Sequence, residues 1–114
     1  MITIEKLIAY GADTKTGLAR CMGNEGFYLR LVGMEMADPN FARLEKAAAE
    51  GETRAAFEAA HALKGAVGNL ALTPLYDPLC EVTELLRNAT GSVDTGDLIP
   101  AIRRALDELK ALAE

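Results

Sequence analysis

Apolar residues recur every three to four positions along most of the chain, and no segment shows the strict alternation that indicates a β-strand. A first clear helix is predicted between Asn24, a favourable N-cap residue, and the Asp38-Pro39 pair that interrupts the pattern. Its apolar stripe consists of Phe27, Leu31 and Met34, with Tyr28 and Val32 beside it. We expect this stripe to be buried against other helices.

The middle of the chain predicts two helices joined by a short turn. The first starts at Pro39, which is favoured in a first turn, and ends at Gly51, which suits a C-terminal cap. Its stripe consists of Phe41, Leu44 and Ala48. The helix that contains His61 begins directly afterwards, near Glu52 or Thr53. Such a short connection favours antiparallel neighbours.

Two helical segments complete the C-terminal half. Thr73-Pro74 is a helix-start signal, and the stripe that follows consists of Leu75, Leu79, Val82 and Leu86. Pro78 lacks a backbone donor, which predicts either an irregular first turn or a start at Asp77. Residues 89–97 form a loop. The last helix starts at Asp94 or Asp97 and carries Leu98, Ile102, Leu106, Leu109 and Leu112 on one side.

The N-terminal region is less regular. It predicts a short helix or turn from Thr3 to about Tyr10, an irregular stretch over 11–17, and a helical piece around 18–22. Because one-sided helices bury their stripes against one another, we predict an all-α fold. The expected architecture is an up-and-down antiparallel four-helix bundle with one or two short extra N-terminal helices, and residues 1–114 form a single domain.

Composition and charge narrow the class of protein. The net charge is −5, and the Lys and Arg residues are scattered, which disfavours nucleic acid or an anionic membrane surface as a partner. Cys21 and Cys80 lack metal-ligand or C-x-x-C spacing, so both are interpreted as reduced packing residues. The chain shows no signal-peptide pattern and no run of 18 apolar residues. We therefore expect a cytoplasmic, soluble monomer.

The single histidine, His61, lies within AAHALKGAVGNL, residues 59–70. At about 100° per residue, the face opposite His61 consists of Ala56, Ala59, Ala60, Leu63, Ala66, Val67 and Leu70. Gly65 and Gly68 share the face of His61, although each costs roughly 1 kcal/mol against alanine in a helix interior. These glycines leave a bare patch where another molecule can approach the imidazole closely.

An exposed imidazole is a competent nucleophile near neutral pH, so His61 could accept a group and pass it on. Lys64, one turn later, would place a cation beside an anion carried by the ring, although an exposed pair contributes only about 0–1 kcal/mol. Phe57, one turn earlier, either packs against a neighbouring helix or belongs to a docking patch. Since the usual catalytic companions are missing, we expect a partner to complete the active site and this chain not to be an enzyme by itself.

The run AHALKGAVGNLAL, residues 60–72, resembles the signature of histidine-containing phosphotransfer (Hpt) domains, and GLARCMGNEGFYLRLVGMEM is similar to that family's second-helix region. The resemblance implies that His61 accepts a phosphoryl group on Nε2, that Lys64 lies near the phosphate, and that Gly65 and Gly68 admit the partner. It further implies reversible transfer between His61 and an aspartate of a response-regulator receiver domain, in a relay fed by a histidine kinase or hybrid kinase. Mg²⁺ would be held by the receiver, and this chain would hold no metal or cofactor.

Three positions depart from the family pattern. Ala71 stands where glycine is frequent, and Pro78 interrupts the following helix. Thr83 stands where a Gln or Glu often steadies the imidazole. Because threonine is shorter, Glu84 and Asn69 are alternative candidates for that role, and the sequence does not choose between them.

Two other functions are compatible with the helical pattern. A non-phosphorylated interaction module that binds a receiver or kinase would not need a histidine on an uncrowded face. A bundle that uses His61 as a haem or metal ligand is disfavoured, because no second ligand faces it within the chain. The leading hypothesis is therefore a phosphohistidine carrier in a multistep two-component phosphorelay.

Overall fold

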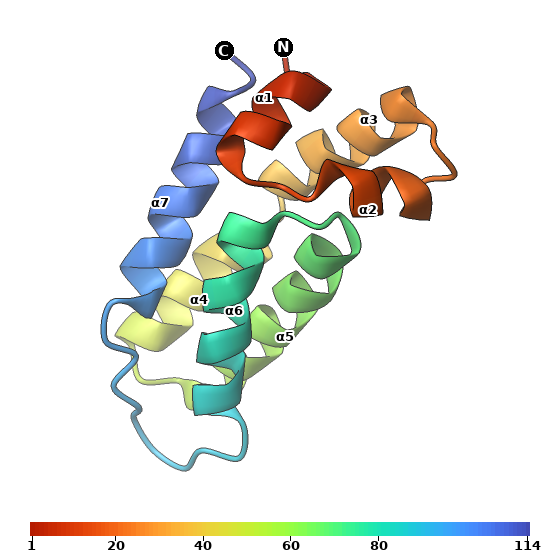
Figure 1. Cartoon of the computed structure of the whole chain (residues 1–114). Helices are drawn as coiled ribbons and strands as arrows, with labels where there is room; N and C mark the ends of the chain where they lie inside the picture. Colours follow the sequence, from red (N-terminus) through yellow and green to blue (C-terminus); the bar gives the residue numbers. More distant parts are fainter.

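The computed structural model describes all residues from 1 to 114, which form seven α-helices and no strand. The helices are α1 (Ile4–Tyr10), α2 (Thr14–Arg20), α3 (Glu25–Met36), α4 (Asn40–Ala49), α5 (Thr53–Asn69), α6 (Thr73–Leu86) and α7 (Leu98–Ala111). Helices α4 to α7 form an elongated bundle, and α1 to α3 gather at one end of it, where both termini also lie (Figure 1). The all-α class and the helical bundle are confirmed.

The core lies between the bundle helices, each of which packs against the next. Six leucines are almost completely buried and come from every one of these helices: Leu44, Leu63, Leu75, Leu79, Leu106 and Leu109. Each such side chain stabilises the fold by about 1.5–3 kcal/mol relative to its exposed state. On α4 the buried alanine is Ala47 rather than Ala48. No helix combines the length and the apolar character needed to cross a bilayer.

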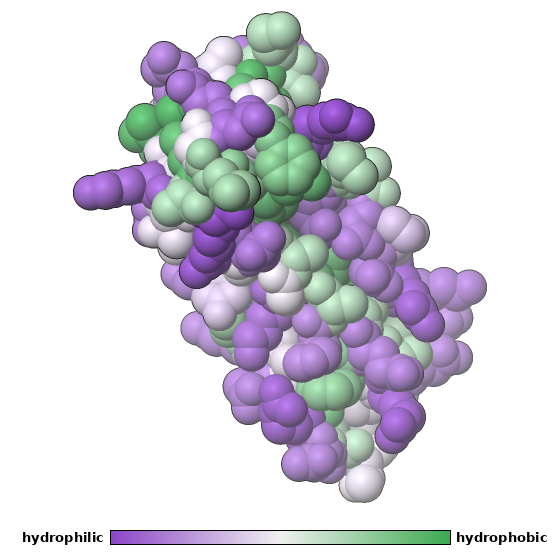
Figure 2. All heavy atoms as spheres, turned by 90° about the vertical axis from the view of Figure 1, so that its right-hand side faces the viewer, coloured by the Kyte–Doolittle hydropathy of each residue, from purple (hydrophilic) through white to green (hydrophobic).

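Helix α3 buries a different face from the one predicted. Tyr28 and Val32 are fully buried, whereas Phe27 and Met34 are 47% and 63% exposed. The Tyr28 hydroxyl donates to the buried carbonyl of Leu70, 2.9 Å away, which anchors this side of the helix. Phe27 and Met34 consequently face outward, whereas Leu31 is half-buried against the core. Figure 2 shows apolar side chains gathered at the end of the molecule where α1 to α3 lie.

Helix α2 begins at Thr14, earlier than predicted, because Asp13 caps it. The Asp13 carboxylate accepts a hydrogen bond from the backbone N–H of Thr16 at 3.2 Å and another from the Thr16 hydroxyl at 2.7 Å. These two bonds hold the pKa of Asp13 below its usual value. The segment predicted to be irregular is therefore an ordered turn followed by a helix that ends at Arg20.

Helix α6 runs through Pro78 without a break, so the predicted start at Asp77 is wrong. A proline inside a helix costs about 3 kcal/mol, because it removes one backbone hydrogen bond and crowds the carbonyl four residues earlier. Leu75 and Leu79 flank Pro78 and are both fully buried. Their burial, at about 1.5–3 kcal/mol each, offsets the penalty and keeps the helix whole from Thr73.

Candidate functional site

Helix α5 places His61 on the surface, as the pattern of the sequence predicted. Ala59, Ala60 and Leu63 are fully buried on the opposite face, so the imidazole is directed away from the core. The His61 side chain is exposed and makes no hydrogen bond within the chain. Its ring stacks instead on Phe57, with 5.6 Å between ring centroids and 16° between ring planes.

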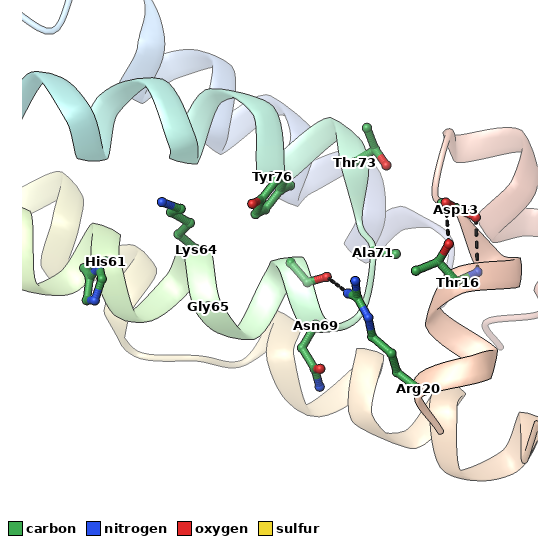
Figure 3. Close-up of a pocket in the computed structure, with 11 residues that line it drawn as sticks. Asp13, Thr16, Arg20, His61, Lys64, Gly65, Asn69, Ala71, Thr73 and Tyr76 are labelled. Atoms are coloured by element: carbon green, nitrogen blue, oxygen red, sulfur yellow. Dashed lines mark hydrogen bonds between the residues drawn. The ribbon is translucent and has the colours of Figure 1, made fainter. Parts of the chain in front are cut away.

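A shallow depression of about 550 Å³ extends along α5 from His61 to α2 (Figure 3). Its lining brings together five of the predicted site residues: His61, Lys64, Gly65, Gly68 and Asn69. Sequence reasoning missed the contributions of α2 and α6, which are Asp13, Thr16, Arg20, Thr73 and Tyr76. The D-x-x-T capping pattern could have located the start of α2, but no local signal shows that α2 lies beside α5.

The two glycines of the motif occupy different surroundings. A Cβ atom added to Gly65 would meet no atom within 4 Å, so this position is open to a partner. A Cβ atom added to Gly68 would lie 2.6 Å from Cε1 of Tyr76, a distance that real Cβ contacts do not show. The prediction of a docking role therefore remains available for Gly65, whereas Gly68 is required for the packing of α6 against α5.

The C-terminal end of α5 is covered by α2. The Arg20 guanidinium donates to the Gly68 carbonyl, one of the last carbonyls of the helix, which lack a partner within it (Figure 3). A cation at this position also opposes the negative end of the helix dipole. Asn69, the last residue of α5, lines the depression beside this contact. Arg20 thus joins α2 to the end of the depression farthest from His61.

Lys64 is turned toward α6. Figure 3 shows its side chain rising toward α6 with the ammonium end turned away from Tyr76, whereas the His61 ring points away from α6. The charge of Lys64 also helps to lower the pKa of Glu84 on α6, where the main cause is the hydrogen bond from Arg87. Lys64 therefore does not contact the imidazole in this structure, and four rotatable bonds separate its ammonium group from the helix.

Three residues were candidates for steadying the imidazole, and they differ in their contacts and in their distance along the chain from His61. Thr83 is fully buried, and its hydroxyl donates to the Leu79 carbonyl at 2.6 Å, so the suggested role for Thr83 is not supported. Glu84 is paired with Arg87 at 3.1 Å. Asn69 lines the depression, but two helical turns separate it from His61. The residue that touches the imidazole is Phe57.

Ala71 adopts a left-handed backbone conformation, with φ at +56°. It lies in the tight turn between α5 and α6, where its N–H donates to the Gly68 carbonyl and its own carbonyl accepts from the N–H of Asp13. Glycine adopts this conformation without steric strain. Ala71, which departs from the glycine frequent in the family pattern, therefore occupies a position where the backbone conformation itself favours glycine.

No group of three or more His, Cys, Asp or Glu residues lies close enough together to hold a metal ion. A model of a protein family described as the Hpt domain matches residues 31–112, which include the whole of α4 to α7 and His61. A search of curated proteins found no match, and neither did a search of solved structures.

Proposed function

The chain belongs to the Hpt domain family, and on that premise we propose that His61 exchanges a phosphoryl group with an aspartate of a receiver domain. Hpt domains are phosphotransfer carriers of phosphorelays, where they interact with receiver domains and kinases, and they are carriers rather than catalysts. One observation carries the finer assignment. His61 is the single histidine of the chain, lies within the matched region and presents an exposed ring.

The proposed transfer needs only the imidazole from this chain. With the ring proton on Nδ1, the free Nε2 lone pair attacks the phosphorus of an aspartyl phosphate. The N–P bond forms as the P–O bond to the aspartate breaks, and the electron pair of that bond returns to the carboxylate. The reverse reaction regenerates the aspartyl phosphate. The partner would supply both the aspartate and the Mg²⁺ that neutralises the phosphoryl charge.

The surface around His61 supports docking of a folded partner. Gly65 is open, and beside it α3 contributes Leu31 and Met34 to a groove that Ala66 and Asn69 of α5 complete. Asn69 also lines the depression that holds His61, so the apolar groove and the site are continuous. We place the receiver across this continuous surface, where it would cover the exposed apolar side chains of α3.

The test is transfer of label to His61. A receiver domain from the same organism, phosphorylated with labelled acetyl phosphate, is mixed with the wild-type chain or with His61→Gln. We expect acid-labile, alkali-stable label on the wild type and none on the variant. Equal labelling of His61→Gln would overturn the assignment. A receiver variant whose phosphorylated aspartate is replaced by asparagine is the matched control and should transfer nothing.

A second function, a non-phosphorylated interaction module, gives a different result in the same experiment. In that case the receiver would bind the wild-type chain and His61→Gln with equal affinity, and neither chain would acquire label. Titration of the phosphorylated receiver followed by calorimetry separates binding from transfer. The exposed, uncrowded imidazole favours the carrier, because a module that only binds gains nothing from a nucleophile at this position.

A further inference from the structure

The imidazole of His61 is held by an aromatic ring instead of a hydrogen bond. Phe57 lies one helical turn before it on α5, and the two rings stack nearly parallel, 5.6 Å apart at 16°. Thr83, which the family resemblance offered as a steadying residue, directs its hydroxyl to the Leu79 carbonyl. The Phe57 stack is thus the contact that restricts the orientation of the His61 ring.

Phe57 is itself contacted by Arg87, the residue that follows α6. The Arg87 guanidinium carbon lies 5.3 Å from the centroid of the Phe57 ring, a cation–π distance. Arg87 is in turn bound to Glu84, with 3.1 Å between Nη2 and Oε1 and further contacts from Nε at 3.3 Å. Phe57 is half-buried and packs against the edge of the core, so its ring has little freedom to rotate.

We propose that Phe57 is the positioning residue for His61, and that Arg87 and Glu84 act through Phe57 to fix the plane of the imidazole. The inference rests on the proposed function, since its purpose is to direct Nε2 toward the incoming phosphorus. Transfer between two side chains requires near-linear approach of the nitrogen, so a ring held in one orientation reacts more often per encounter. A hydrophobic side chain without a flat face would fill the same space but would not orient the ring.

The stack has a spectroscopic signature. A proton above an aromatic face is shifted by the ring current, so the two carbon-bound protons of the His61 imidazole report directly on Phe57. In Phe57→Leu we expect these resonances to move toward the positions of an unstacked imidazole, and in Phe57→Tyr we expect them to stay. Phe27→Leu makes the same chemical change on an exposed phenylalanine of α3 and should leave them unmoved.

Kinetics then separate positioning from docking and from folding. At a saturating concentration of phosphorylated receiver, the transfer rate of Phe57→Leu should be roughly fivefold lower than that of the wild type. This factor corresponds to about 1 kcal/mol of aromatic pairing. Phe57→Tyr keeps an aromatic ring and should have the wild-type rate. The receiver concentration at half-maximal rate should not change. Labelling by phosphoramidate, a small donor that needs no fixed approach, should proceed at the wild-type rate. Arg87→Met, which keeps an unbranched stem without charge, should show about a twofold decrease.

Two results would overturn the proposal. One is an unchanged pair of His61 resonances in Phe57→Leu, and the other is a transfer rate at saturating receiver that is the same in Phe57→Leu as in the wild type. A thermal melt of each variant shows whether a decrease follows from unfolding, and Phe57→Tyr remains informative if Phe57→Leu does not fold. Failure of the proposed function is distinguishable, because the wild-type chain would then acquire no label from the phosphorylated receiver, whatever its resonances show.

Discussion

The exposed face of α5 has two ends that differ in what covers them. The open end, with Phe57, His61 and Gly65, faces solvent apart from the contacts that Phe57 makes with α6. The covered end begins at Gly68, where Tyr76 and Arg20 close over the helix. The two glycines of one short motif therefore have different surroundings: Gly65 lies on open surface, where we propose that a partner docks, and Gly68 leaves room for the Tyr76 ring.

The largest effect is expected from closing the open end. Gly65→Leu adds a side chain whose Cβ atom meets no atom within 4 Å, one helical turn after the imidazole on the same face, so it should slow transfer from a receiver on the order of 100-fold. Thermal stability should not fall, because leucine favours a helix more than glycine does. Lys64→Ala is the comparison and should change the rate at most about fivefold. Transfer at the wild-type rate in Gly65→Leu would show that this end is not a docking surface.

At the covered end, the smallest possible side chain should already destabilise the fold. In Gly68→Ala the new methyl group would lie 2.6 Å from the Tyr76 ring, and we expect the free energy of unfolding to fall by about 2 kcal/mol, as for other overpacked sites. Urea denaturation measures the change. Gly65→Ala is the matched control, and its free energy of unfolding should rise by up to about 1 kcal/mol. If Gly68→Ala and Gly65→Ala changed the free energy of unfolding in the same direction, the distinction between the two glycines would be contradicted.

The stability of the fold should also respond to pH through Glu35, which lines the groove between α3 and α5 together with Asn69. Burial, together with the neighbouring Asp38 carboxyl, raises the pKa of Glu35 to about 8, and its Oε2 has no hydrogen-bond partner. The folded protein then keeps a proton that the unfolded chain releases above its ordinary pKa of 4.5. This group therefore contributes full stability below pH 4.5, and the contribution is lost as the pH rises toward 8.

Glu35→Gln removes that ionisation. We expect its free energy of unfolding to exceed that of the wild type by about 1 kcal/mol at pH 8, a value reduced to allow for the partial exposure of Glu35, and to equal it near pH 4. Urea denaturation at pH 4, 6 and 8 gives the profile. Glu58→Gln, an exposed position on α5, is the control. An advantage of Glu35→Gln that stays constant from pH 4 to 8 would contradict the assignment.

The smallest effect is expected in the turn that follows the covered end. Ala71→Gly should raise the free energy of unfolding by about 1 kcal/mol, because the left-handed backbone at φ +56° strains alanine and not glycine. Differential scanning calorimetry measures the change. Ala62→Gly, at an exposed helical position on α5, should instead lower the free energy of unfolding by about 1 kcal/mol. A loss in both variants would show that the turn tolerates alanine without strain.

The sequence by itself determined the helices other than α2, and the position of His61. Both follow from a local rule: an apolar stripe must be buried, so the helix that carries it has one face inside and the other outside. That rule was enough to place His61 and Gly65 on the exposed face of α5. It failed for α3, where two adjacent stripes were available and the bond from Tyr28 to the Leu70 carbonyl decided which one enters the core.

Only the tertiary structure decided which residues surround the site. Arg20 and Tyr76 reach the depression from α2 and α6, and their proximity to Gly68 depends on how three helices pack, which no spacing along the chain encodes. For the same reason the contacts that hold the imidazole were not visible in the sequence. Phe57 lies within the helix of His61, but Arg87 reaches it from the end of α6, which it directly follows. Local periodicity fixes the direction of a side chain, and the packing of distant segments fixes its neighbours.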